Sequence, residues 1–247
     1  MSNSLSNKDV EFLTALYYKE NMNNTNRVIV SRRDRPAKDP LSRELIVRTA
    51  YELLKEQGLA GMSMRKVAKA LDTGPSSLYV YVNNLEELNS YVLDSGLGEL
   101  VLPDSGEGSW KDRLFGALNS YFLLLIENPG LAEISFSTIP RGDKYMELIE
   151  YILAALHEGG VSPKSAAWGV DLLLLYVTSI AFEKHTWRKN GTMQPLDIKE
   201  TFKNADPIRF PFIRSLNEQM FSEGTELQER FRWGLEATLQ GIQLNNK

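Results

Sequence analysis

Residues 59–88 read LAGMSMRKVAKALDTGPSSLYVYVNNLEEL. Ser63 can cap a short helix, because a serine hydroxyl at this position accepts a hydrogen bond from an N–H of the first turn. Residues 72–74 then predict a tight turn. Pro75 suits the first position of the next helix, where its missing N–H costs nothing, and this helix is expected to run to about Val82. Two short helices joined by a tight turn that contains glycine predict a helix-turn-helix.

Two further helices flank this pair. The earlier one begins after its cap Ser42 and stops at Gly58, which can adopt the left-handed conformation that ends many helices. The later one starts at Asn84, with Glu87 three residues on as in a capping box. It is expected to run past Leu97.

The residues before this domain form a separate extension, residues 1–40. One short helix, Lys8–Glu20, is expected in it. Residues 31–40 are charged, contain two prolines and show no apolar periodicity, which predicts an arm or linker. Such an arm can reach a minor groove of DNA, or it can serve only as a solubilising tail. Its basic residues are Arg32, Arg33, Arg35 and Lys38.

Nearly every later apolar pattern also has helical spacing. Residues 103–109 read PDSGEGS and predict a loop that separates a domain over residues 41–102 from one over residues 109–247. Residues 189–206 are polar and predict a second loop. The fold class is therefore all-α, with an N-terminal helix-turn-helix three-helix domain and a C-terminal helical domain. The helical segments expected in the second domain are 110–127, 129–138, 142–158, 163–188, 207–222 and 225–243.

The composition favours a protein of the cytoplasm. The chain has 247 residues and no cysteine, which excludes disulfides and thiolate metal sites. Its polar N-terminus does not resemble a signal peptide. The apolar runs at residues 121–126 and 172–180 are shorter than the roughly 18 residues that indicate a membrane span, so no membrane contact is expected.

Charge is distributed unevenly along the chain. The net charge is −4, but residues 27–71 carry 11 Lys or Arg against 5 Asp or Glu, whereas residues 72–247 carry 15 against 24. A basic segment in an acidic chain indicates a local contact with a polyanion. A solvated charged face is the alternative explanation.

The sequence does not indicate an enzyme. It lacks a P-loop, a dinucleotide-binding fingerprint and a Gly-x-Ser-x-Gly motif, and its two histidines, His157 and His185, stand apart. No cofactor and no metal are expected. The remaining rival interpretation is a helical protein-interaction module whose helix-turn-helix has degenerated and no longer binds DNA.

Residues 42–100 resemble the DNA-binding domain of the TetR family of bacterial transcriptional regulators, and look closest to its tetracycline-repressor branch. That family has Gly after the first helix and a Ser/Thr-x-Arg-x-Val/Leu-Ala motif in the second. It has a Ser/Thr-Leu-Tyr core in the third helix and an Asn-Lys-Glu-Glu-Leu-like start of the fourth. The C-terminal domain is similar in layout, though more loosely. The matching residues are Gly58, Ser63, Arg65, Val67, Ala68, Leu71, Leu78, Tyr79, Glu86, Glu87 and Leu88.

Three positions depart from the family pattern. Asp72 stands where the family usually has Gly, so the turn needs an Asp in a conformation that Gly adopts more easily. Tyr81 stands where His or a similar residue is usual. Leu85 stands where Lys is usual, and the absent Lys removes an expected phosphate contact.

By this resemblance the third helix enters the major groove of double-stranded DNA. Tyr79 and Tyr81 are expected at the edge of the groove, although packing within the domain is an alternative role for Tyr79. Arg65, in the second helix, is the better candidate for a strong contact with a base or a phosphate, because serine hydroxyls discriminate poorly between bases. Lys66 is expected on a phosphate or in solvent. The residues expected at base edges are Pro75, Ser76 and Ser77.

The resemblance also implies a homodimer that binds a palindromic operator and acts as a repressor released by a small-molecule effector. Segments 163–188 and 225–243 are expected to pair between protomers, although their apolar residues suit an intramolecular core equally well. Without a partner pattern for the two histidines, a metal-assisted tetracycline site is not expected, and the effector is expected to be largely apolar. The expected effector contacts, or else plain core, are Phe115, Phe122, Phe136, Met146, Trp168 and Tyr176, with Tyr121, Tyr145 and Tyr151 as further candidates.

Overall fold

The computed structural model describes residues 40–104, 106, 108–138, 140–190, 195–220 and 225–246. Internal contacts divide the chain into two units, Met1–Pro40 and Leu41–Lys247. The expected helix Lys8–Glu20 and the basic arm lie outside the described residues. The helices described below all belong to the second unit.

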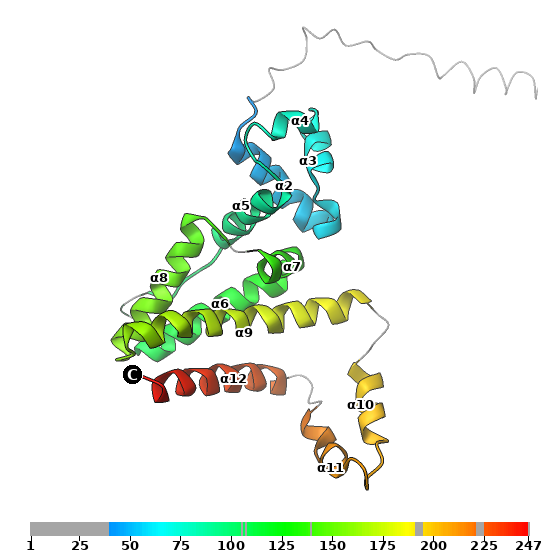
Figure 1. The fold of residues 1–247 in the computed structure, drawn as a ribbon, viewed down its shortest axis with the longest axis vertical. Coiled ribbons are helices and arrows are strands. Elements are labelled where there is room, and N and C mark those ends of the chain that lie inside the picture. Colours follow the sequence, from blue (N-terminus) through cyan, green and yellow to red (C-terminus); the bar gives the residue numbers. More distant parts are fainter. Residues whose placement is uncertain are drawn as a thin grey trace, which may run out of the picture. The chain divides into compact units, whose positions relative to one another are not determined.

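The described part of the chain is all-helical and contains no β-strand (Figure 1). A single turn of 3₁₀ helix, η2, also occurs at Leu59–Gly61. The α-helices, in chain order, are α2 (Arg43–Gln57), α3 (Met64–Ala70), α4 (Pro75–Leu78), α5 (Leu85–Leu97), α6 (Trp110–Glu127), α7 (Pro129–Ser137), α8 (Asp143–Glu158), α9 (Pro163–Asn190), α10 (Pro195–Lys203), α11 (Pro211–Met220) and α12 (Thr225–Leu244).

The helix-turn-helix region forms as its sequence predicts, because the predicted caps are made. The Ser42 hydroxyl accepts a hydrogen bond from the N–H of Leu45 at 3.1 Å, and the Ser63 hydroxyl accepts one from the N–H of Lys66 at 3.3 Å. Gly58 ends α2 with φ 67°, a conformation that glycine adopts without steric cost. The boundaries predicted from these residues are confirmed.

Several predicted boundaries were wrong, including the start of segment 207–222, because α11 begins at Pro211. Helix α4 ends at Leu78 and continues as a turn, in which the Leu78 carbonyl accepts hydrogen bonds from the N–H groups of Tyr81 and Val82. Helix α5 ends at Leu97, where Gly98 forms its C-cap. The loop predicted at residues 189–206 contains α10, because its polar composition obscured a helix that begins at a proline.

Helix α9 is the central helix of the C-terminal domain and packs against α6, α7, α8 and α12. Its segment Pro163–Thr186 is long and apolar enough to cross a membrane by length and composition alone, which corrects the expectation that no segment reaches this length. Half of its most apolar window is buried inside the structure. A helix that is apolar on several sides is expected in the core of a helical domain, and the contacts of α9 fit that role.

Glycines let α9 and α12 approach each other closely. A Cβ atom at Gly234 of α12 would lie 2.1 Å from the Tyr176 hydroxyl of α9, and one at Gly169 of α9 would lie 2.9 Å from Ile242 of α12. The Tyr176 hydroxyl also donates a hydrogen bond to the backbone carbonyl of Phe231 at 3.4 Å. These two helices are therefore held together within one chain.

Helix α7 joins the helix-turn-helix domain to the C-terminal domain, since it contacts α2 and α5 as well as α6 and α9. A Cβ atom at Gly96 of α5 would lie 2.5 Å from Leu131 of α7, and one at Gly130 of α7 would lie 2.6 Å from Leu54 of α2. The buried apolar residues of both regions belong to one continuous core.

Candidate functional site

The turn between α3 and α4 is a Schellman motif with an aspartate at its left-handed position. Asp72 has φ 49° and is the one non-glycine residue with positive φ among the described residues. The Asp72 N–H donates to the Lys69 carbonyl at 3.0 Å, and the Thr73 N–H donates to the Ala68 carbonyl at 2.9 Å. This is the 5→2 and 6→1 pairing that ends helices. The conformation inferred from the missing family glycine is confirmed.

Helix α4 presents its first turn to solvent and its end to the core. Pro75 and Ser76 are exposed, and Ser77 is half-buried. Leu78 is fully buried, whereas the Tyr79 side chain is 52% exposed, so the Tyr79 ring is available for an external contact. Tyr81 is half-buried. Polar side chains at the accessible N-terminus of α4 have the placement that base contact in a major groove requires.

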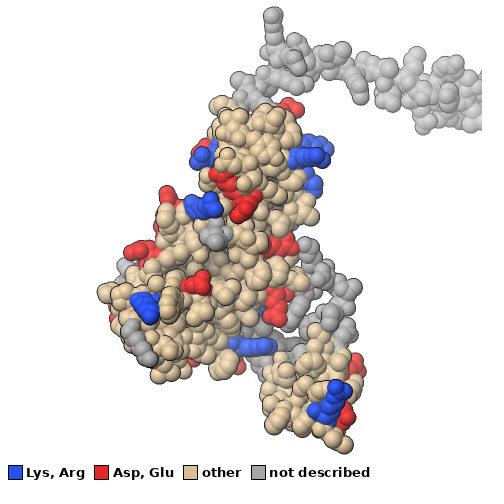
Figure 2. Space-filling model, in the orientation of Figure 1, with Lys and Arg blue, Asp and Glu red and all other residues tan. Residues whose placement is uncertain are grey.

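Helix α3, which packs against α4, carries exposed basic side chains. Arg65, Lys66 and Lys69 are exposed. The Lys66 ammonium donates a hydrogen bond to the Ala60 carbonyl at 2.8 Å, which holds its charge near the end of η2. Figure 2 shows Lys and Arg side chains at the edges of the helix-turn-helix region on the face drawn. Positive charge beside an exposed recognition helix favours contact with phosphates.

Glu87 fixes the connection between α4 and α5. One of its carboxylate oxygens accepts hydrogen bonds from the backbone N–H and side-chain amide of Asn83, at 2.6 and 2.8 Å. The other accepts one from the Tyr91 hydroxyl at 3.1 Å. The hydrogen bond from the Asn83 N–H is the main reason that the pKa of Glu87 lies below its ordinary value. The Asn84 side chain accepts from the Glu87 N–H at 2.8 Å, so the predicted capping box forms with the return bond shifted to Asn83.

A cavity of about 380 Å³ lies among helices α6, α7, α8 and α9; we call it the α6–α9 cavity. The Tyr121 hydroxyl of α6 and the Thr178 hydroxyl of α9 are hydrogen-bonded across its wall at 3.2 Å. Burial raises the pKa of Tyr121 to about 12, so this phenol stays neutral and can donate a hydrogen bond. The lining residues are Tyr121, Ser135, Phe136, Ser137, Thr138, Pro140, Tyr145, Asp171, Leu174, Leu175 and Thr178.

Of the six residues chosen from the sequence as effector contacts, Phe136 lines this cavity and the other five do not. Phe122 is buried and stacks on Phe231. Phe115 is half-buried against the core. Met146 and Trp168 are exposed. Tyr176, the sixth, packs on α12. A contact between these five residues and an effector stays a prediction.

Sequence reasoning missed most of the polar wall of the cavity because it searched for aromatic and Met residues. Of the further candidates, Tyr121 and Tyr145 do line it. One signal was present in the sequence: Asp171, Leu174, Leu175 and Thr178 are spaced i, i+3, i+4 and i+7 along α9. Residues at this spacing share one helix face.

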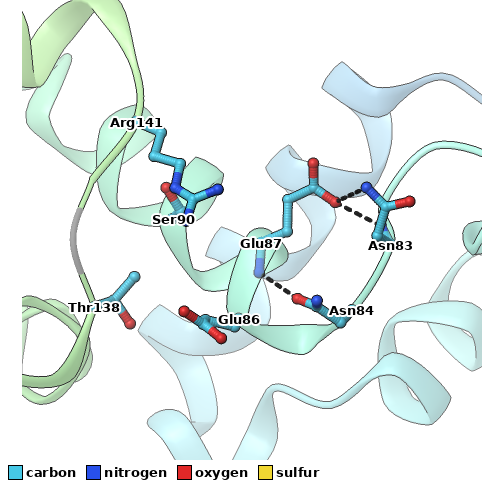
Figure 3. Close-up of a pocket in the computed structure, with 7 residues that line it drawn as sticks. All are labelled: Asn83, Asn84, Glu86, Glu87, Ser90, Thr138 and Arg141. Atoms are coloured by element: carbon cyan, nitrogen blue, oxygen red, sulfur yellow. Dashed lines mark hydrogen bonds between the residues drawn. The ribbon is translucent and has the colours of Figure 1, made fainter.

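A smaller cleft of about 140 Å³ lies between the start of α5 and the segment that links α7 to α8. Figure 3 shows Arg141 of that segment reaching toward Ser90, with Glu86 pointing into the same cleft. Thr138 lines both this cleft and the α6–α9 cavity. The linking segment therefore separates the cavity from the helix-turn-helix domain.

The described residues contain no group of three or more His, Asp or Glu side chains placed to hold a metal ion. His185 of α9 pairs with Glu133 of α7 at 2.9 Å, and both side chains are largely buried. His157 lies in the last turn of α8. The structure thus assigns the two histidines to different helices.

Helices α9 and α12 expose large apolar side chains. Trp168, Leu172 and Leu175 follow one face of α9 and are each at least half exposed, and Trp233 of α12 is 71% exposed. In contrast, Phe231, Leu235 and Leu239, in the segment 225–243 that was expected to pair between protomers, are buried within the chain. Large exposed apolar patches are typical of protein–protein interaction sites.

Comparison with known proteins agrees with this architecture. The family described as "Bacterial regulatory proteins, tetR family" matches residues 46–88. The family described as "Tetracyclin repressor-like, C-terminal domain" matches residues 102–245. The second match alone covers more than half of the chain.

Individual relatives are similar over most of the chain. The HTH-type transcriptional repressor DrrR1 of Streptomyces coeruleorubidus is 26% identical over 85% of this chain and 81% of the relative. The tetracycline repressor protein class D of Escherichia coli is 26% identical over 83% of this chain and 90% of the relative. The structure of Streptomyces coelicolor ActR in complex with actinorhodin superposes with a TM-score of 0.74 at 31% identity, over 84% of this chain and 99% of ActR. The chain is a member of the TetR family of transcriptional regulators, with a DNA-binding domain of that family followed by a tetracycline-repressor-like C-terminal domain.

Proposed function

We propose that this protein is a cytoplasmic repressor that binds a palindromic operator as a homodimer and leaves it when a small molecule occupies the α6–α9 cavity. The observation that carries the proposal is the exposed first turn of α4, held by an intact turn after α3 and flanked by exposed basic side chains. Pro75, Ser76 and Ser77 are the proposed base contacts, with Tyr79 and Tyr81 at the groove edge. Arg65 and Lys66 are the proposed anchors.

The dimer is supported by the apolar faces of α9 and α12. Trp168, Leu172 and Trp233 expose large apolar surfaces, which are costly to leave in water. A second copy that presents the same faces would cover them in a twofold arrangement, since such interfaces use one patch on both subunits. A dimer also doubles the contact with DNA, because each helix-turn-helix reads only one half-site.

Effector control is supported by the position of the linking residues Thr138, Pro140 and Arg141, which line the cavity or the cleft beside α5. A ligand that prefers one position of this segment shifts the population of dimers toward that position. The two recognition helices then no longer match the spacing of the half-sites, and operator affinity falls. The ligand affinity must fall by the same factor when the operator is bound.

The basic arm before the described residues is a further proposed contact. Arg32, Arg33 and Arg35 would enter a minor groove next to the half-site. Deletion of residues 1–38 should then weaken operator binding and flatten its dependence on salt, because fewer phosphates are neutralised. An unchanged salt slope would argue for a solubilising tail.

The proposed function is tested by selecting duplexes from a random DNA pool with the purified full-length chain. Enrichment of an inverted repeat by the wild type, with loss of enrichment in the variant Arg65→Ala/Ser76→Ala, is the expected result. Weak binding that vanishes as salt rises, with no enriched sequence, would favour the protein-interaction module. The intact Schellman turn at Asp72 supports the regulator over that alternative.

A further inference from the structure

The α6–α9 cavity has one charged residue among its described lining residues, Asp171. Asp171 is exposed on α9, and it takes part in none of the ion pairs formed between described residues. The negative charge of Asp171 affects Tyr145 in the cavity wall. Burial raises the pKa of Tyr145, and the Asp171 carboxylate raises this pKa further. A carboxylate without a basic partner at a cavity mouth favours a positive group on a ligand and disfavours a negative one.

The wall itself is aromatic. Rings of Tyr121, Phe136 and Tyr145 line the cavity. Phe136 is 52% exposed, and its ring stacks on the ring of Phe182 with the centroids 4.7 Å apart. Aromatic faces attract both planar rings and cations. The volume of about 380 Å³ lies within the range of small-molecule sites.

The hydroxyl groups of the wall add hydrogen-bonding capacity. Six lining residues carry a hydroxyl: Tyr121, Ser135, Ser137, Thr138, Tyr145 and Thr178. A ligand with polar substituents on an aromatic frame meets partners here that a purely aliphatic ligand would leave unused. The acidic balance of residues 72–247, with 15 Lys or Arg against 24 Asp or Glu, also favours the approach of a cation.

We propose that the α6–α9 cavity takes a planar aromatic ligand with a positive charge, whose charged group faces Asp171 and whose ring lies against Phe136 and Tyr145. The inference rests on the proposed function, because it names the chemical class of the effector for the same cavity. It refines the expectation of a largely apolar effector by adding a charge.

Three probes with related tricyclic ring systems test the proposal: 9-aminoacridine, a cation at neutral pH; acridone, which is neutral; and acridine-9-carboxylate, an anion. Each is titrated by calorimetry into the full-length protein without DNA. The cation should bind about three- to tenfold more tightly than acridone, the range expected for a partly screened charge pair with a ring contact, and the anion should bind more weakly than acridone. Added salt should reduce the preference.

The variant Asp171→Asn should reduce the preference for the cation to the contribution of the aromatic rings, by weakening 9-aminoacridine binding more than acridone binding. The matched control is Glu150→Gln, which removes an exposed carboxylate of α8 that does not line the cavity, and it should keep the preference. Equal affinities for the three probes, no binding of 9-aminoacridine, or an undiminished preference in Asp171→Asn would overturn the proposal.

Failure of this inference is distinguishable from failure of the proposed function. The same preparations are used for selection from the random DNA pool. If the protein enriches an inverted repeat but shows no preference for the cation, the ligand class is wrong and the regulator stands. If no DNA is enriched, the proposed function fails, and the titrations alone decide the chemistry of the cavity.

Discussion

The carboxylate of Asp94 on α5 accepts a hydrogen bond of 3.0 Å from the backbone N–H of Tyr145 in the first turn of α8. Gly142 makes this approach possible, because a Cβ atom there would lie 1.9–2.2 Å from the carboxylate atoms of Asp94. Tyr145 lines the α6–α9 cavity, and α5 is the next helix after α4, the proposed recognition helix. The contact therefore ties the cavity wall to the DNA-binding domain.

Loss of this contact should alter operator affinity, although neither Asp94 nor Tyr145 is a proposed DNA contact. Asp94→Ala frees the start of α8, so the amides of residues 142–146 should exchange hydrogen faster. Affinity for the selected operator should change about five- to tenfold, the lower part of the range typical of coupling between sites. Fluorescence anisotropy with labelled operator measures the affinity.

Two further variants control this experiment. Asp94→Asn keeps an acceptor oxygen and should behave nearly as the wild type, whereas Gly142→Ala should reproduce Asp94→Ala by forcing the carboxylate away. Wild-type affinity in both alanine variants would show that the contact carries no coupling.

The left-handed Asp72 makes a stability prediction for the helix-turn-helix. A β-branched residue tolerates φ 49° poorly, so Asp72→Val should be less stable than Asp72→Gly by about 1–2 kcal/mol, the cost of the left-handed conformation for a residue with a Cβ atom. Urea unfolding of the two variants gives the difference. Equal unfolding midpoints would mean that the turn relaxes to another conformation.

Glu87 should make stability depend on pH. Its pKa is lowered in the folded protein, chiefly by the hydrogen bond from the Asn83 N–H. A lowered pKa stabilises the fold at neutral pH, and this stabilisation is lost as the pH falls below the ordinary value of 4.5 and through the folded value. Glu87→Gln should therefore be less stable than the wild type at neutral pH, with the difference shrinking in acid. The control Glu86→Gln removes a charge one position earlier and should lower the free energy of unfolding at neutral pH by less than Glu87→Gln does. If the stability difference between Glu87→Gln and the wild type were the same at every pH, the stabilising role of the Glu87 carboxylate would be refuted.

The exposed face of α9 and α12 should hold the dimer together. Trp168→Glu combined with Trp233→Glu places charges on side chains that are 65% and 71% exposed in the single chain, so folding should survive. Dimer affinity should weaken by at least about 2 kcal/mol, as expected for buried aromatic residues at an interface. Analytical ultracentrifugation measures this, with Leu123→Glu on α6 as the control for an exposed apolar residue elsewhere. A double variant that stays dimeric would place the interface on another face.

Arg65 should dominate the contacts made by α3. If the guanidinium reads a base, Arg65→Ala is expected to weaken binding to the selected operator by about 1–3 kcal/mol. If the guanidinium binds a phosphate, Arg65→Ala is expected to weaken binding to all duplexes and to lower the slope of the salt dependence by about 1. Arg214→Ala, which removes an exposed arginine of α11, is the matched control. Unchanged binding to every duplex would remove Arg65 from the interface.

The helix-turn-helix was predictable from sequence because its signals are local. Caps such as Ser42 and Ser63 act over three or four residues, and an aspartate at position 72, where the family usually has glycine, is enough to indicate a left-handed residue. Local signals also misled: the mostly polar composition of residues 189–206 hid α10, although Ile198 and Phe202 stand at helical spacing i, i+4.

The cavity was much less predictable, because it depends on tertiary packing. Aromatic residues such as Phe122 and Tyr176 look equivalent to Phe136 in the sequence, yet they pack against α12 rather than into the cavity. The contact between Asp94 and Tyr145 joins residues 51 positions apart, and no spacing rule predicts such a pair.

In the proposed complex, two α4 helices of one dimer read two half-sites at a fixed spacing. The most direct measurement compares affinity for the selected inverted repeat with affinity for the same duplex carrying five extra base pairs at its centre, which rotates one half-site by about half a helical turn. The affinity for the lengthened duplex should be at least about 100-fold lower and should equal the affinity for a duplex with a single half-site. Equal affinity for both duplexes would contradict the proposed complex, because the two recognition helices would then bind independently of each other.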